Sequence, residues 1–320
     1  MRRFLIFLLF VALLGAAAWY GEQWNYAAPG PSANGAVVLI KPGEGVAAIA
    51  QQLAQAGVIG NAELFRLGLR LRNQQSGLKA GEYWFPPRAS MADAASILIA
   101  GKSIEYKLTA AEGLTSDMIY RLVQADPVLV DDVAQEPAEG TLLPETYLFT
   151  RGMTRVHLLA LMQAAQQKFI AEHWAARAPN LPFTTPAQAI VLASIVEKET
   201  AIPEERRHIA SVFVNRLRAG MKLESDPTII YGITGGYPLG RGIRESELTR
   251  ATPYNTYVVA GLPPGPICNP GKDAIAAVLD PEVTPDLYFV ATGKGGHVFA
   301  ASYAEHQKNV AKWRQVEKQR

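Results

Sequence analysis

The chain has 320 residues, of which 49% are hydrophobic and 19% charged, so it is long enough to form two packed domains. This composition excludes a disordered chain, and 31 basic against 29 acidic residues leave a net charge of +2, which gives no indication of nucleic-acid binding. The single cysteine, Cys268, excludes a disulfide framework and a cysteine-rich metal site.

The N-terminal segment has the most unusual composition. Two arginines precede an uncharged apolar run from Phe4 to Ala18, which is followed by the aromatic pair Trp19 and Tyr20. About 17 apolar residues in a helix extend about 25 Å, close to the ~30 Å hydrocarbon core of a bilayer. We therefore predict a transmembrane anchor over residues 1–20, with a cytoplasmic N-terminus. The alternative is a cleaved signal peptide, because residues 16–18 are alanines of the kind a signal peptidase requires.

Residues 21–35 are rich in Gly, Pro, Ala and Asn without apolar periodicity, and this pattern predicts a tether. A small module follows over residues 36–102, where the apolar spacing predicts a strand, two helices, a strand and a further helix. These elements are expected at 37–40, 49–56, 61–71, 79–85 and 92–100. Asn61 suits the N-cap of the second helix, and Gly101 suits the end of the last one.

Residues 103–320 are predicted to form a larger, mostly helical domain with a β-hairpin. The expected elements are a strand at 104–108, helices at 115–123, 156–171, 188–201, 204–217 and 304–317, and a hairpin at 286–300. Residues 222–270 are rich in Gly and Pro and predict a long loop region, which is often functional when it packs on a rigid scaffold. The predicted fold class is therefore α+β.

Several common catalytic motifs are absent from the sequence. Gly101-Lys102-Ser103 imitates the end of a phosphate-binding loop, but Ser96 stands where that loop requires its first glycine. No G-x-S-x-G occurs, and the five histidines never have H-E-x-x-H spacing. We expect neither a metal nor a cofactor.

Two carboxylates near the C-terminal end of an apolar helix are better candidates. Helical spacing places Glu199 on a stripe of bulky apolar residues, whereas Glu197 follows smaller and more polar ones. A carboxyl over an apolar stripe, at the negative end of the helix dipole, has a raised pKa, as protonation of a glycosidic oxygen requires. The alternative is an ordinary solvated helix end, where both glutamates pair with Lys198, Arg206 or Arg207.

The predicted loop region contains side chains that suit sugar binding. Asp226, Tyr231 and the run Tyr254-Asn255-Thr256 bring carboxylate, aromatic, amide and hydroxyl groups together. Aromatic faces bind the C–H surfaces of sugars, while amides and hydroxyls bind sugar hydroxyl groups. Alternatively, the tyrosines fix the loop to the core, and the Pro-Gly runs are simple turns.

Motifs along nearly the whole chain resemble those of the MltG/YceG-like endolytic murein transglycosylases. They are K-P-G-E-G-V-A-A-I-A-Q-Q-L (41–53), L-P-E-T-Y-L-F (143–149), L-A-S-I-V-E-K-E-T (192–200), V-F-V-N-R-L (212–217), D-P-T-I-I-Y-G (226–232), Y-N-T-Y (254–257), G-L-P-P-G-P-I-x-N-P-G (261–271) and L-Y-F-V-A-T-G-K-G-G-H-x-F (287–299). Each motif alone is weak, but together they are highly specific. Cys268 occupies the one loosely specified position.

The resemblance implies a single-pass inner-membrane enzyme, with residues 4–20 in the membrane and the catalytic domain in the periplasm, that cuts peptidoglycan glycan strands internally. It assigns the catalytic acid to Glu199, the glutamate before Thr in E-K-E-T, which helical spacing also favours. The predicted substrate-binding residues are Tyr254, Asn255, Thr256, Asp226 and Tyr231. The resemblance further implies a LysM-like module over residues 36–102, a lysozyme-like catalytic domain over residues 103–320, and peptidoglycan synthases (penicillin-binding proteins) as partners.

The implied reaction forms 1,6-anhydro-N-acetylmuramic ends on nascent strands, with Glu199 as the single acid and base. Two alternatives stay open. One is a muramidase that hydrolyses the same bond, with Asp226 or Glu224 as a second carboxylate. The other is a non-catalytic, membrane-tethered scaffold that binds peptidoglycan through the LysM-like module, which could equally serve as a packing platform.

Overall fold

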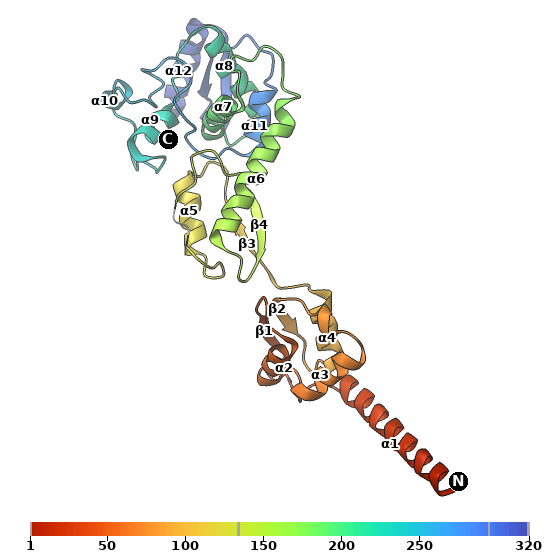
Figure 1. Ribbon diagram of the computed structural model, residues 1–320. Helices are drawn as coiled ribbons and strands as arrows, with labels where there is room; N and C mark the ends of the chain where they lie inside the picture. The colour runs from red at the N-terminus through yellow and green to blue at the C-terminus, as the bar shows by residue number, and fades with distance from the viewer. Residues whose placement is uncertain (1, 133–134, 294, 319–320) are drawn as a thin grey trace. The chain divides into compact units, whose positions relative to one another are not determined.

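The structure, a computed structural model, describes residues 2–132, 135–293 and 295–318 (Figure 1). It is a mixed α+β protein, mostly helical with small two-stranded sheets, which confirms the predicted class. The chain divides into two compact units. Unit 1 comprises residues 1–106 and 148–152, and unit 2 comprises residues 107–147 and 153–320.

Unit 1 contains α1 (Arg2–Ala27), a long apolar helix whose side chains are exposed over most of its length. Among the described residues, it is the one helix long and apolar enough to cross a membrane, with a mean hydropathy of 2.2. The structure differs from the predicted tether over residues 21–27, which are helical. Packing explains the extension, because Tyr26 is buried against the rest of unit 1 and Glu22 forms an ion pair with Arg72 at 2.8 Å.

The rest of unit 1 is a small sheet packed with three helices. Strands β1 (Ala36–Ile40) and β2 (Gly81–Phe85) lie at the two predicted strand positions, and they pair antiparallel. The helices are α2 (Val46–Gln55), α3 (Ala62–Leu71) and α4 (Met91–Ala100), and the 3₁₀ turn η1 (Gln75–Gly77) precedes β2. Asn61 caps α3 by accepting the N–H of Leu64, and Gly101 ends α4 in the left-handed region, which confirms both predicted signals.

A second sheet pairs β3 (Glu105–Thr109) with β4 (Thr146–Thr150), and the division between the units passes through both strands. The sequence analysis did not predict β4. Phe149 is its one buried residue, so the alternation that marks a strand is weak. Helices α5 (Ser116–Ala125) and α6 (Arg155–Trp174) belong to unit 2, and a threonine caps each of them.

The core of unit 2 is built mainly by α7 (Pro186–Glu199), α8 (Arg206–Arg218) and α11 (Lys272–Leu279). Every residue from Ala189 to Val196 is buried, so α7 is surrounded by other elements. The 3₁₀ turn η2 (Pro203–Glu205) separates α7 from α8 at the predicted break. The sequence analysis did not predict α11, which is only two turns long.

The predicted loop region is less irregular than expected, since it contains α9 (Asp226–Thr234) and the single turn α10 (Glu245–Leu248). The hairpin of β5 (Tyr288–Ala291) and β6 (His297–Ala300) and the helix α12 (Tyr303–Glu317) confirm their predictions. Lys294, in the predicted hairpin turn, lies outside the described residues.

Candidate active site

Both candidate glutamates lie in the last turn of α7. A capping box between Thr185 and Gln188 starts this helix, and its apolar run is buried as far as Val196. The helix ends at Glu199, and the two carboxylates reach different neighbours: Glu197 the loop before α11, and Glu199 the start of α9. These neighbours decide what each carboxylate can do.

Glu199 has an uncharged hydrogen-bond partner. The Ser225 hydroxyl donates to Glu199 Oε1 at 2.5 Å. Burial raises the pKa of the Glu199 carboxyl from 4.5 to about 7, and the nearby charge of Asp226 acts in the same direction. The Ser225 hydrogen bond and Arg216 favour the carboxylate and oppose this rise. A large fraction of Glu199 is therefore protonated near neutral pH and can donate a proton.

Glu199 lines a pocket of about 400 Å³, whose walls come from α8, the start of α9, β5 and α12. The other lining residues with charged, hydrogen-bonding or aromatic groups are Arg216, Glu224, Asp226, Tyr257, Phe289, His306 and Trp313. A pocket that combines aromatic rings with several carboxylates suits a ligand with both C–H surfaces and hydroxyl groups, such as a sugar.

The other two carboxylates of this pocket have fixed partners. Glu224 forms an ion pair with Arg216 at 3.0 Å, and the same guanidinium donates to the carbonyl of Leu287. The Tyr257 hydroxyl donates to Asp226 Oδ1 at 2.7 Å. Burial raises the pKa of Tyr257, and Asp226 adds to the rise, so this hydroxyl keeps its proton. Glu224 and Asp226 are therefore both constrained by groups of the pocket itself.

A buried chain of hydroxyl groups fixes Ser225. Its N–H donates to Thr256 Oγ1 at 2.9 Å, and its carbonyl accepts from Thr228 Oγ1 at 2.6 Å. The hydroxyls of Thr256 and Thr228 are 2.9 Å apart, and both threonines are fully buried. Because these bonds hold the Ser225 backbone on both sides, its hydroxyl has little freedom to leave Glu199.

The structure brings only part of the predicted site together. Asp226 lines the pocket with Glu199, and Thr256 lies behind them in the hydroxyl chain. Asn255 is buried, and its amide donates to the carbonyls of residues 247, 248 and 250, so it fixes the loop around α10. Tyr231 and Tyr254 contact each other, with ring centroids 4.7 Å apart, and pack against the core of unit 2. Among the described residues, neither tyrosine belongs to the lining of the Glu199 pocket.

Sequence reasoning missed Ser225, Arg216 and the α12 residues His306 and Trp313. A serine before Asp-Pro at the start of a helix is a recognisable signal, although here its hydroxyl bonds Glu199 and not the helix backbone. No spacing rule connects α12 with Glu199, because only the tertiary fold brings them to one pocket.

Glu197 is also buried, and burial raises the pKa of its carboxyl, while the Gly271 N–H and the charge of Arg206 oppose this rise. Glu197 Oε2 accepts the N–H of Gly271 at 2.9 Å, and Oε1 lies 3.8 Å from Arg206. The two side chains are 7% and 9% exposed, so this is a buried ion pair and not the solvated helix end that was the alternative. The expected pairing with Arg206 is confirmed for Glu197, whereas Glu199 pairs with none of the three expected cations among the described residues.

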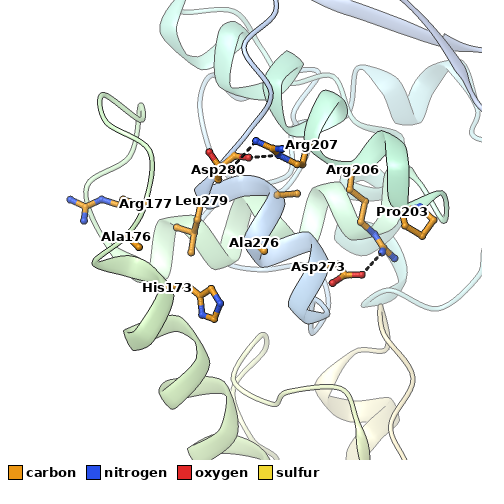
Figure 2. Close-up of a pocket in the computed structure, with 11 residues that line it drawn as sticks. His173, Ala176, Arg177, Pro203, Arg206, Arg207, Asp273, Ala276, Leu279 and Asp280 are labelled. Atoms are coloured by element: carbon orange, nitrogen blue, oxygen red, sulfur yellow. Dashed lines mark hydrogen bonds and ion pairs between the residues drawn. The ribbon is translucent and has the colours of Figure 1, made fainter.

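Arg206 also lines a second pocket, of about 360 Å³ (Figure 2). Two ion pairs are drawn there, Arg206 with Asp273 at 3.2 Å and Arg207 with Asp280 at 2.8 Å, while Arg177 donates to the carbonyl of Trp174. Neither pocket contains a metal-binding cluster, since no three His, Cys, Asp or Glu side chains of the described chain are suitably grouped. Of the two pockets, the one lined by Glu199 contains a carboxyl whose pKa is raised to about 7.

Comparison with known proteins gives a consistent result. The profile of the YceG-like family matches residues 38–312. The endolytic murein transglycosylase of Streptococcus pneumoniae serotype 2 (strain D39) is 30% identical over 358 residues, which cover 95% of this chain. The chain spans 64% of that protein's length. The endolytic murein transglycosylase of Bacillus subtilis (strain 168) is 27% identical over 332 residues, covering 94% of this chain and 91% of the relative.

A crystal structure of a yceG-like protein from Listeria monocytogenes is also similar. It has a TM-score of 0.54 and 29% sequence identity, and the match covers 87% of this chain and 99% of that one. The likeness therefore extends over both units of the chain.

Proposed function

The chain belongs to the YceG-like family, and on this basis we propose that it is an endolytic murein transglycosylase. In this proposal it cleaves the β-1,4 bond between N-acetylmuramic acid and N-acetylglucosamine within glycan strands of peptidoglycan, and leaves 1,6-anhydro ends. Nascent strands are the proposed substrate, so that cleavage ends their elongation. The observation that carries the proposal is a carboxyl with a pKa of about 7, hydrogen-bonded to a neutral hydroxyl, in a pocket with aromatic walls.

Glu199 acts first as acid and then as base. Its protonated carboxyl donates to the glycosidic oxygen as the bond from C1 of N-acetylmuramic acid breaks. The C6 hydroxyl of the same sugar attacks C1, and the Glu199 carboxylate accepts its proton, which closes the anhydro ring and restores the acid. No water and no second carboxylate take part in this sequence. Ser225 keeps the carboxyl oriented through both steps.

The contacts of the remaining polar residues separate those that we expect to touch the sugar from those that support the site. Asp226 and Tyr257, which share a hydrogen bond at the pocket, are the groups we expect to touch the sugar. Thr256 and Asn255 act through the backbone, since their side chains hold Ser225 and the loop around α10. Tyr231 and Tyr254 support the loop region from the core, and substrate contact by these two stays a prediction.

The proposed location rests on the apolar helix of unit 1. We place α1 in the inner membrane as a retained anchor and the catalytic unit, with a lysozyme-like fold, in the periplasm. A cleaved signal sequence would have the same length and composition, so release of residues 1–20 is the alternative. The LysM-like module is proposed to bind glycan, and peptidoglycan synthases are proposed as partners.

A hydrolase is the second candidate, because Asp226 and Glu224 line the pocket of Glu199 and could activate water. One experiment separates the candidates: the full chain in detergent is incubated with purified uncrosslinked peptidoglycan, and the released fragments are identified by mass spectrometry. Internal cuts with 1,6-anhydro ends that disappear in Glu199→Gln support the transglycosylase. Reducing ends favour the hydrolase, and retention on peptidoglycan without cleavage favours the scaffold.

A further inference from the structure

The C-terminal end of α1 packs against α3, and these contacts fix the two helices relative to each other. Tyr26 stacks on Phe65 with ring centroids 6.5 Å apart, and a side chain at Gly68 would collide with the Tyr26 ring. Glu22 is paired with Arg72 at 2.8 Å, and the Arg72 guanidinium lies 3.8 Å from the centre of the Tyr26 ring. Figure 1 shows α3 beside the C-terminal end of α1. Helix α3 therefore keeps a fixed height along the α1 axis.

This height can be compared with the dimensions of a bilayer. The apolar run of α1 ends at Tyr20, and α3 packs against residues 22–26. At 1.5 Å per residue, Glu22 lies about 3 Å and Tyr26 about 9 Å beyond Tyr20 along the helix. The headgroup layer on each side of the hydrocarbon core is about 5–8 Å thick. If α1 spans the membrane, α3 overlaps this layer.

The exposed face of α3 has the composition of a helix at a membrane surface. Leu67 and Leu71, four residues apart, are each 43% exposed, the exposed Arg70 lies beside them on the same face, and Glu63, one turn before Leu67, is paired with Arg66. Leucines that enter the headgroup boundary beside an arginine that meets lipid phosphates are typical of interfacial helices. The Glu22–Arg72 pair also removes the net charge that an isolated glutamate would place at the edge of the hydrocarbon.

We propose that the α3 face formed by Leu67, Arg70 and Leu71 binds the phospholipid headgroup layer of the membrane that α1 spans. The module of unit 1 then lies at the membrane surface in a fixed position, and its connection to the anchor is not a flexible tether. This inference rests on the proposed retention of α1 as an anchor, but it does not depend on the catalytic activity.

Site-directed spin labelling of the full chain tests the proposal. Leu67→Cys and Leu71→Cys variants, each carrying a nitroxide, are reconstituted in vesicles of phosphatidylethanolamine and phosphatidylglycerol. Val37→Cys, at a residue of β1 that is 51% exposed, is the control position in the same module. The wild-type chain is treated identically to measure labelling of Cys268, which is buried. Accessibility to apolar oxygen and to a water-soluble nickel complex is measured at each site.

We expect the oxygen-to-nickel ratio at residues 67 and 71 to exceed that at residue 37 severalfold. Arg72→Ala, which removes the ion pair with Glu22 and the guanidinium beside the Tyr26 ring, should weaken the contact with α1 and lower the ratio at residue 67 toward that at residue 37. Arg66→Ala should not lower this ratio, because Arg66 pairs with Glu63 within α3.

Equal ratios at all three sites in a protein that floats with the vesicles overturn the proposal. Dipolar broadening would place a second copy of the chain on this face and overturn it as well. A protein that does not float with the vesicles refutes the anchor and this inference together, while the peptidoglycan digestion still tests the enzyme.

Discussion

The two glutamates at the end of α7 relate differently to two pockets of similar volume: Glu199 lines one of them, whereas Glu197 pairs with Arg206, which lines the other. Arg206, which lines the pocket of Figure 2, is the buried cation closest to Glu197, and the Gly271 N–H donates to the same carboxylate. In the other pocket, Glu199 receives a hydrogen bond from Ser225, and burial keeps much of it protonated. Burial raises the pKa of both carboxyls, but Arg206 and a backbone N–H oppose the rise at Glu197, whereas at Glu199 the pKa reaches about 7, where the group can exchange a proton near neutral pH. Pocket size does not distinguish these two cases, but the partners of the carboxylates do.

The largest expected effect separates the two glutamates directly. Glu199→Gln keeps the shape of the side chain but cannot give up a proton, so we expect the rate of peptidoglycan cleavage to fall by about 10²–10⁴-fold. Glu197→Gln keeps an acceptor for the Gly271 N–H, and we expect its rate to stay within about threefold of the wild type. Initial rates of fragment release at pH 6 measure both. Comparable losses in the two variants would contradict the assignment of the acid to Glu199.

The second effect concerns stability on the Glu197 side. Arg206→Met leaves Glu197 buried without its cation, and we expect a loss of about 3 kcal/mol in the free energy of unfolding. Arg207→Met is the matched control, because Arg207 and its partner Asp280 are 57% and 68% exposed and their pair contributes at most about 1 kcal/mol. Urea denaturation of the detergent-solubilised chain compares the two variants. Equal losses would show that burial of the Arg206 pair has no special effect.

The sequence could distinguish the two glutamates because helical spacing alone assigns Glu199 to the bulky apolar stripe. It could not give their partners. Arg206 reaches Glu197 across a turn that begins at Pro203, and Ser225 reaches Glu199 from a helix that composition had marked as loop. Pro227 in the first turn of α9 is a helix-start signal, but the many glycines and prolines around it outweigh that signal in a pattern analysis.

Unit 1 shows the same division between local and tertiary information. The caps at Asn61 and Gly101 depend on neighbouring residues, and both are correctly predicted. The helical state of residues 21–27 depends on Tyr26 and Glu22 packing against α3, which lies about forty residues further along the chain. Local composition therefore predicted a tether where tertiary contacts make a helix.

A smaller effect tests the hydroxyl partner of Glu199. The Ser225 hydrogen bond favours the carboxylate and lowers its pKa, so Ser225→Ala should raise the pKa further and move the alkaline limb of the pH–rate profile to higher pH. We expect the cleavage rate at the pH optimum to fall about tenfold, because losing one hydrogen bond costs about 1.5 kcal/mol in the transition state. Ser225→Thr keeps the hydroxyl and should restore most of the rate and the original limb.

Ser211→Ala is the control for this change, because Ser211 is equally buried and its hydroxyl bonds Thr284 instead of a carboxyl. It should leave the position of the alkaline limb unchanged. If Ser225→Ala lowers the rate without moving the limb, Ser225 serves only the packing around α9 and does not act on Glu199.

The last expected effect is a gain in stability, visible only at alkaline pH, from the same substitution that removes activity. Because the pKa of Glu199 is about 7 in the folded chain against 4.5 for an ordinary glutamate, the stability from this group is fully present below pH 4.5 and is lost as the pH rises through 7. Glutamine does not ionise, so Glu199→Gln should melt a few degrees above the wild type at pH 8, corresponding to about 1–3 kcal/mol, and at the same temperature at pH 4. Glu197→Gln should show a smaller gain, because burial raises the pKa of Glu197 as well, but the Gly271 N–H and the charge of Arg206 oppose that rise. A thermal midpoint of Glu199→Gln that follows the wild type at both pH values would mean that the carboxyl is ionised without penalty, and that burial does not prepare it as an acid.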